Sequence, residues 1–120
     1  MTNFNDDKIW IHACKIDDVP ENSGICLKYM GKQIALFNFT SYGKWFAAQN
    51  MCPHKNQFVL SRGILGDKNN EPKIACPLHK KTFSLINGKN LEGEDYEIEI
   101  YPVKIVNQSI YIGIPQKVKY

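Results

Sequence analysis

Two short segments, each with one cysteine and one histidine, constrain this chain more than any other feature of its sequence. The first reads CPH from Cys52 to His54, and the second reads CPLH from Cys76 to His79. They hold two of the four cysteines and two of the three histidines in 120 residues. Thiolate sulfur and imidazole nitrogen are both metal ligands. The segments therefore predict a metal site built from two loops.

The spacing of the ligands distinguishes the kinds of metal site. Structural zinc sites usually place two like ligands in one knuckle, as in C-x2-C. Here each segment offers one thiolate and one imidazole, and a single residue separates Cys52 from His54, so these side chains diverge toward different metal ions. A Rieske 2Fe–2S centre needs this arrangement, with Cys52 and Cys76 on one iron and His54 and His79 on the other. A mononuclear zinc site and a chance grouping remain as alternatives.

Four further residues are expected to support the two loops. Pro53 and Pro77 follow the cysteines directly and stiffen the backbone there. Phe83 comes shortly after His79 and is placed to pack beneath the loop. Gly88, in the sequence NGK, permits a turn that closes the segment.

Hydrophobic alternation favours strands along the rest of the chain. The expected strands are 8–13, 24–30, 34–39, 44–50, 72–75, 81–85, 96–106 and 109–114. Residues 15–24 allow at most one short helical turn, and Pro102 suggests an edge position or a bulge. Cys14 and Cys26 lie in expected strands, as buried free thiols rather than ligands. The sequence predicts a single all-β domain.

Charge is unevenly distributed along the sequence. The net charge is only +3, which gives no reason to expect a nucleic-acid partner. Residues 52–89, however, contain seven Lys or Arg and two acids, a net of +5. This excess is either a solvated basic face or a docking surface for an acidic partner. The docking residues would be Lys55, Lys80 and Lys81.

Membrane and export signals are not expected. No apolar run approaches the roughly 18 residues that span a bilayer. The N-terminal segment is polar and acidic, unlike a signal peptide. The cytoplasm is the expected location, where four cysteines indicate thiols or metal ligands rather than disulfides.

The ligand segments resemble a known family. CPHKNQFVLSRGILGD and ACPLHKKTFSLINGKNLEGE are similar to the Rieske-type small subunit of NAD(P)H-dependent nitrite reductase, and the likeness extends over about residues 9–114. It implies a Rieske-like fold for one domain, 1–120. An antiparallel β-sandwich or barrel base, about 8–45 and 90–115, would carry a cluster-binding insertion at about 46–89. Many Rieske proteins have glycine soon after each histidine, where this chain has Lys55-Asn56 and Lys80-Lys81.

The resemblance also implies a function. The chain would carry a Rieske 2Fe–2S cluster and transfer electrons within a nitrite reductase that makes ammonium in nitrate assimilation. A large partner subunit would hold flavin, a 4Fe–4S cluster and sirohaem, so the small chain would not act on nitrite itself. Two alternatives remain. One is a stand-alone Rieske ferredoxin that serves an oxygenase or another reductase, and the other is a zinc-stapled binding module without a redox role.

Overall fold

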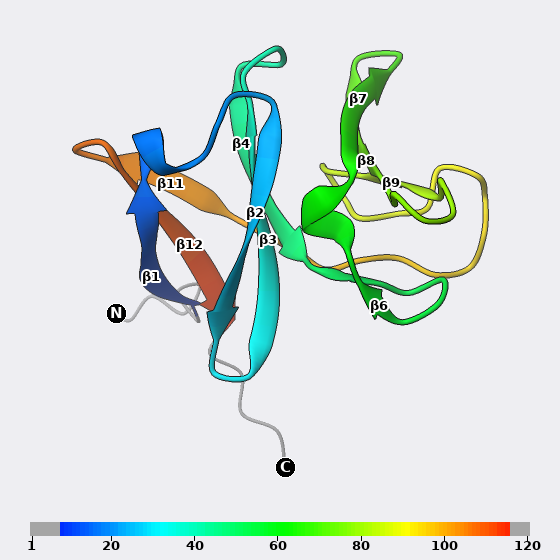
Figure 1. Ribbon diagram of the computed structural model, residues 1–120, viewed down its shortest axis with the longest axis horizontal. Helices are drawn as coiled ribbons and strands as arrows, with labels where there is room; N and C mark the ends of the chain where they lie inside the picture. The colour runs from blue at the N-terminus through cyan, green and yellow to red at the C-terminus, as the bar shows by residue number, and fades with distance from the viewer. Residues whose placement is uncertain (1–7, 116–120) are drawn as a thin grey trace, which may run out of the picture.

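The structure is a computed structural model, and it describes residues 8–115. Within that range the chain forms four antiparallel sheets and two 3₁₀ turns, with no α-helix (Figure 1). The prediction of an all-β chain is therefore confirmed. No described segment is a helix long and apolar enough to cross a membrane.

Two of the sheets form a base. One has the order β1-β12-β11 and the other has the order β10-β4-β3-β2. The base strands are β1 (Lys8–Lys15), β2 (Ser23–Tyr29), β3 (Lys32–Phe39), β4 (Lys44–Gln49), β10 (Ile100–Tyr101), β11 (Val103–Val106) and β12 (Ser109–Pro115). Both sheets are open at their edges and pack through a shared apolar core. The base is therefore a sandwich, and the closed barrel that the sequence also allowed is wrong.

Strand β3 lies at the centre of the molecule, because both of its faces are buried. Its residues from Ile34 to Phe39 are all at most 6% exposed. Ile34 and Leu36 face the core between the base sheets, together with the isoleucines of β12. Ala35, Phe37 and Phe39 face a second core that contains Cys52 and Cys76. A strand buried on both faces reads as a nearly continuous apolar run, which explains the sequence IALFNF, where only Asn38 is polar.

The second core belongs to a separate lobe beside β2, β3 and β4 (Figure 1). Its elements are β5 (Met51–Cys52), β6 (Gln57–Phe58), the 3₁₀ turn η2 (Leu60–Arg62), β7 (Ile64–Lys68), β8 (Glu71–Ala75) and β9 (Thr82–Ser84). The buried side chain of Asn50 joins this lobe to the base. Its Oδ1 accepts a hydrogen bond from the Ser61 N–H at 2.7 Å, and its Nδ2 donates to Gln33 Oε1 at 2.9 Å.

The expected strand 96–106 is only partly correct. Pro102 separates β10, which pairs with β4, from β11, which pairs with β12, so the chain changes sheets there. Residues 96–99 form no strand, because their backbone bonds elsewhere. The Ile98 N–H donates to the Gly88 carbonyl, and the Glu99 N–H donates to Gln49 Oε1. The short turn expected within 15–24 is present as a 3₁₀ turn, η1 (Ile16–Asp18).

Candidate metal centre

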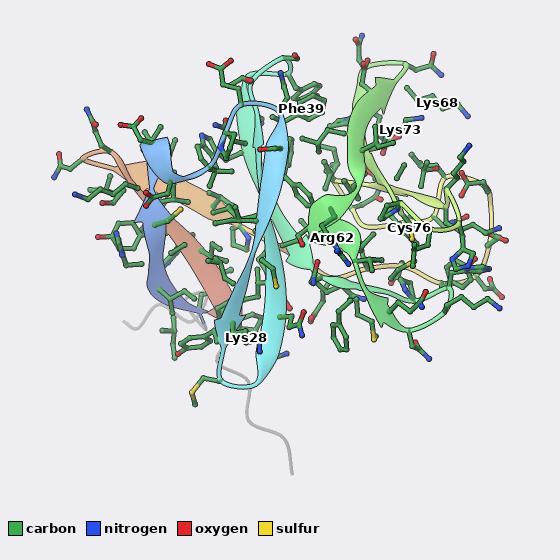
Figure 2. The ribbon with its side chains drawn as sticks, in the orientation of Figure 1. Lys28, Phe39, Arg62, Lys68, Lys73 and Cys76 are labelled. Carbon is green, nitrogen blue, oxygen red and sulfur yellow. The ribbon has the colours of Figure 1, made fainter. Side chains whose placement is uncertain are left out.

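The two Cys/His segments form loops in the second lobe. Cys52 ends β5, and His54 lies in the turn that leads to β6. Cys76 directly follows β8, and His79 lies in the turn before β9 (Cys76 is labelled in Figure 2). The second loop is closed by two backbone hydrogen bonds, from the Lys80 N–H to the Cys76 carbonyl at 2.9 Å and from the Cys76 N–H to the Lys81 carbonyl at 2.8 Å.

The two cysteines lie together at the inner end of the loops. Both are free thiols and each is 1% exposed. Burial raises the pKa of Cys52, and the adjacent Cys76 acts in the same direction. The backbone N–H groups of His54 and Lys55 donate to the Cys52 sulfur and lower its pKa. A buried thiol pair with N–H donors already directed at one sulfur is suited to bind a cation as thiolates.

The two histidines lie side by side, with their ring centroids 4.8 Å apart and their planes at 66°. His54 Nδ1 is buried and has no hydrogen-bond partner. Burial lowers the pKa of His54, and the positive charges of Lys81, His79 and Lys55 lower it further. The lowered pKa favours the neutral ring, which is the form that binds metal. His79 is exposed.

The residues present fit a two-iron centre. A buried imidazole nitrogen without a partner is costly unless it receives a ligand. Within residues 8–115, no three or more His, Cys, Asp or Glu side chains gather tightly enough to surround a single ion. A Rieske centre asks for only two protein ligands on each iron. The cysteine pair and the histidine pair supply such a set.

After each histidine, where many Rieske proteins have glycine, this chain has one residue with left-handed backbone. Asn56 has a φ of 53° and Lys80 a φ of 58°. Left-handed backbone favours glycine because a Cβ is strained there, and asparagine tolerates it better than lysine does. Both loops therefore adopt the conformation that glycine gives elsewhere, but with side chains that project into solvent.

The predicted supporting residues lie around the loops. Phe83 is fully buried in the core that contains both cysteines, and Pro53 and Pro77 occupy the two turns. Gly88 has a φ of +82°, and a Cβ there would overlap the Ile98 carbonyl oxygen. These contacts agree with the supporting roles, which remain predictions.

Among the residues outside the ligand set, Lys81 and Cys26 are placed differently from the residues with which they were grouped. Lys55 and Lys80 are exposed, whereas Lys81 forms an ion pair with Glu94, with 2.9 Å between Nζ and Oε2. Cys14 is partly buried, but Cys26 is exposed. The prediction that both of these thiols are buried is therefore wrong, because Cys26 lies on β2 at the edge of its sheet.

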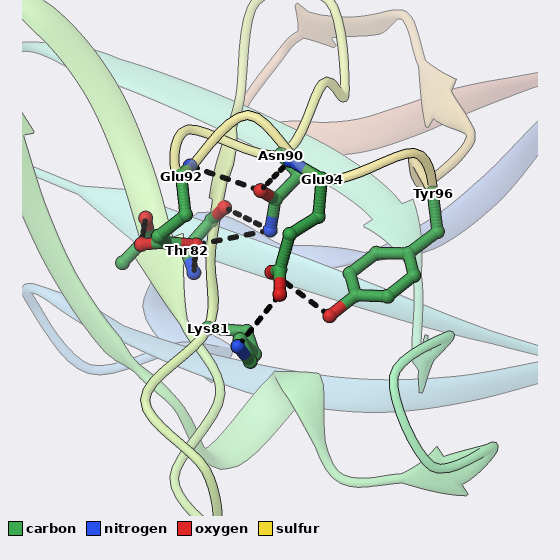
Figure 3. A network of polar contacts seen from close by, with 6 residues as sticks. All are labelled: Lys81, Thr82, Asn90, Glu92, Glu94 and Tyr96. Atoms are coloured by element: carbon green, nitrogen blue, oxygen red, sulfur yellow. Dashed lines mark hydrogen bonds and ion pairs between the residues drawn. The ribbon is translucent and has the colours of Figure 1, made fainter.

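A third loop beside the site was not predicted from the sequence. Residues 90–96 form a loop bound to the segment after His79 through Lys81, Thr82, Asn90, Glu92, Glu94 and Tyr96 (Figure 3). The only signal in the sequence is a cluster of acids, Glu92, Glu94 and Asp95, placed after a basic segment. The cluster of acids does not indicate which lysine forms an ion pair with it.

Two opposed loops that bring two buried thiols together and two imidazoles side by side define the class of two-iron electron-transfer domains. A family model described as a Rieske-like [2Fe-2S] domain matches residues 9–113. The chain belongs to this Rieske-like [2Fe-2S] family, in which it is similar to the small subunits of nitrite reductase. Its cofactor type is therefore the Rieske 2Fe–2S cluster.

Individual relatives support this placement. The chain is 33% identical to the nitrite reductase (NADH) small subunit of Salmonella typhimurium over 80% of this chain and 89% of that one. It is 35% identical to the nitrite reductase [NAD(P)H] large subunit of Klebsiella oxytoca, over 89% of this chain but only 11% of that protein's length. It is also 36% identical to a ferredoxin component of Ralstonia naphthalene 1,2-dioxygenase/salicylate 5-hydroxylase systems, covering 86% and 93% of the two chains.

Solved structures agree on the fold. The crystal structure of a protein described as an NADH-dependent nitrite reductase small subunit from Mycobacterium tuberculosis superposes with a TM-score of 0.83. The two chains are 27% identical, and the match covers 94% of this chain and 98% of the other.

Proposed function

We propose that this chain is the Rieske 2Fe–2S electron-transfer subunit of an NAD(P)H-dependent nitrite reductase, acting in the cytoplasm in nitrate assimilation. One observation carries the assignment of the centre: the buried His54 Nδ1 has no partner, and it lies beside His79 in the lobe that buries both cysteines. The similarity to small subunits along most of the chain supports the choice of complex.

The roles of the ligands follow from their surroundings. When bound, the cluster takes up and releases one electron at a time. Cys52 and Cys76 would hold the inner iron as thiolates, in a core that keeps water away from sulfur. His54 and His79 would hold the outer iron as neutral imidazoles, nearer the surface. A cluster held by these four residues would transfer electrons without binding nitrite, so reduction of nitrite would belong to a partner.

That partner is the large flavin- and sirohaem-containing subunit, and the docking surface lies at the histidine end, within the proposed cluster-binding insertion 46–89. Lys55 and Lys80 are exposed there. Phe58 and Leu78 are also half exposed, at 51% and 52%. Apolar side chains with cations beside them suit a partner surface that carries acids around an apolar centre.

Co-expression with the large subunit tests this function. We expect the two chains to purify together, and NAD(P)H to reduce the cluster of the small chain only when the large chain is present. Lys55→Glu and Lys80→Glu should each weaken the complex about tenfold at low salt. Lys68→Glu, on the β7–β8 hairpin (Figure 2), is the matched charge reversal and should weaken it much less. Two chains that never associate would contradict the proposal.

A second function is supported by the similarity to the Ralstonia ferredoxin component. A stand-alone ferredoxin would accept electrons from a separate reductase and pass them to an oxygenase, without a stable complex. The same reconstitution, with an oxygenase in place of the large subunit, separates the two functions. A zinc-stapled module is the third alternative, and zinc without sulfide in the purified chain would favour it.

A further inference from the structure

The ion pair of Lys81 gives this residue a role different from that of its neighbour Lys80. Lys81 Nζ lies 2.9 Å from Glu94 Oε2, and the lysine side chain is 25% exposed. The other carboxylate oxygen, Glu94 Oε1, accepts a hydrogen bond from the Tyr96 hydroxyl at 2.9 Å. One carboxylate therefore connects the segment that follows His79 to the hydroxyl of Tyr96 (Figure 3).

The ring of Tyr96 lies against the first histidine ligand. Its centroid is 5.9 Å from that of His54, with the planes at 60°. It also packs on Phe83, at 6.1 Å between centroids. Phe83 is fully buried among the side chains around both cysteines. Tyr96 therefore contacts the His54 ring from a segment outside both ligand loops.

The loop that carries Tyr96 is fixed by several further hydrogen bonds. Asn90 Oδ1 accepts from the backbone N–H groups of Glu92 and Glu94, both at 2.9 Å. The Glu92 carboxylate accepts from the Thr82 N–H and hydroxyl and from Asn90 Nδ2. A further backbone bond joins the Leu91 N–H to the Thr82 carbonyl at 2.9 Å. This much bonding holds an exposed loop in one position.

We propose that Tyr96, held by Glu94 and Lys81, is a positioning residue that sets the orientation of the His54 ring and shields its side of the cluster from water. The inference rests on the part of the proposed function that places a cluster between His54 and His79. It assigns Lys81 to holding Glu94 in place, whereas Lys80 remains free for docking. Neither Tyr96 nor Glu94 binds iron in this scheme.

A role limited to general stability predicts something different. Loss of a phenol hydrogen bond anywhere in this core would then have similar effects on the cluster. Tyr42 provides the comparison, because its hydroxyl donates to the Asn70 carbonyl at 3.1 Å and its ring packs on Phe39 and Phe46, away from the ligands. Orientation of His54, by contrast, depends on Tyr96 and on the groups that hold it.

The experiment compares Tyr96→Leu, Tyr96→Phe, Lys81→Met and Lys81→Arg with Tyr42→Phe, in protein that carries its cluster. The readouts are the g-values of the reduced cluster by EPR, the rate of cluster loss to an iron chelator, and amide exchange of residues 54–56 in cluster-free protein. We expect Tyr96→Leu to shift the g-values and to speed cluster loss about tenfold. Tyr96→Phe and Lys81→Met, which each lose hydrogen bonds to Glu94, should speed cluster loss about threefold.

The controls decide among the outcomes. Lys81→Arg should restore wild-type behaviour, because its guanidinium can bond the same carboxylate, and Tyr42→Phe should leave the g-values and cluster loss unchanged. Wild-type g-values in Tyr96→Leu would overturn the proposal, and so would equal cluster loss in Tyr42→Phe and Tyr96→Phe. If Tyr96→Leu does not fold, the Lys81→Met and Lys81→Arg pair carries the test. A wild-type chain without cluster signals would instead overturn the proposed function.

Discussion

The two cores on either side of β3 are built by different means. The core between the base sheets is mainly aliphatic, and its side chains alternate along strands such as β1 and β12, which pair at seven positions. The core of the second lobe includes two free thiols, and its strands are two to five residues long. The base is therefore specified by periodicity, and the lobe by particular residues.

This difference indicates what each region needs in order to fold. Long strands with one apolar face keep their register through many equivalent contacts, so a single substitution has a limited effect. Short strands and loops depend on individual glycines, buried amides and metal ligands. Damage to such residues should affect the lobe that holds the centre and leave the base largely intact.

The largest effect is expected from the ligands. Cys52→Ala or His79→Ala should abolish the visible and EPR signals of the cluster, because each variant leaves one of the two irons short of a protein ligand. Cys14→Ala, in base strand β1, should retain both signals in full. Absorption and EPR spectra of anaerobically purified variants provide the measurement. A normal spectrum from either ligand variant would show that these ligands are assigned wrongly.

Two glycines with similar backbone angles give a sharper comparison. Gly88 has a φ of +82° and no room for a Cβ beside the Ile98 carbonyl, whereas Gly93 has a φ of +85° and open space. Gly88→Ala should lower the free energy of unfolding by about 3 kcal/mol, and Gly93→Ala by about 1 kcal/mol. Urea unfolding of the cluster-free proteins measures both values. Equal losses would mean that the contact with Ile98 has no energetic importance.

Substitution of Asn50, which joins the base to the second lobe, should have a more moderate effect on stability. Asn50→Ala leaves the buried Ser61 N–H without its acceptor and removes the bond to Gln33. We expect a loss of about 2 kcal/mol in the free energy of unfolding. Asn87→Ala removes an exposed bond to the Lys89 N–H and is the control, with a loss below about 1 kcal/mol. The idea of a buried connection fails if the two variants are equally stable.

As the pH falls, the loop of residues 90–96 should lose its fixed position before the two base sheets are affected. Bonds from Lys81 and Tyr96 lower the pKa of Glu94, and bonds from Thr82 and Asn90 lower the pKa of Glu92 despite its partial burial. Depressed carboxylate pKa values stabilise the folded loop above the ordinary value of about 4.3. This stabilisation is lost as the pH falls through the depressed values. Amide exchange of residues 90–97 between pH 6 and pH 3 should show the loss, and Glu92→Gln should weaken its pH dependence.

The sequence predicted the parts of the molecule that rest on local pattern. The hairpin around Gly31, the run IALFNF and the turn at Gly88 each follow from alternation or from backbone preference. Spacing alone also proposed the four ligands Cys52, His54, Cys76 and His79, and the structure brings the two cysteines into one core and the two histidine rings side by side. The third loop was not predicted, because the pairing of Lys81 with Glu94 joins residues 13 apart in the chain and has no periodic signal. Residues 96–99 alternate like a strand, but their backbone bonds go to the turn at Gly88 and to Gln49 at the end of β4.

Metal and sulfide analysis of the wild-type chain, purified anaerobically, together with its EPR spectrum after reduction, decides whether the two loops hold a cluster. We expect about two irons and two acid-labile sulfides per chain, with the EPR signal of a histidine-ligated cluster. One zinc per chain without sulfide would contradict this expectation, and would leave the two Cys/His loops as a structural staple.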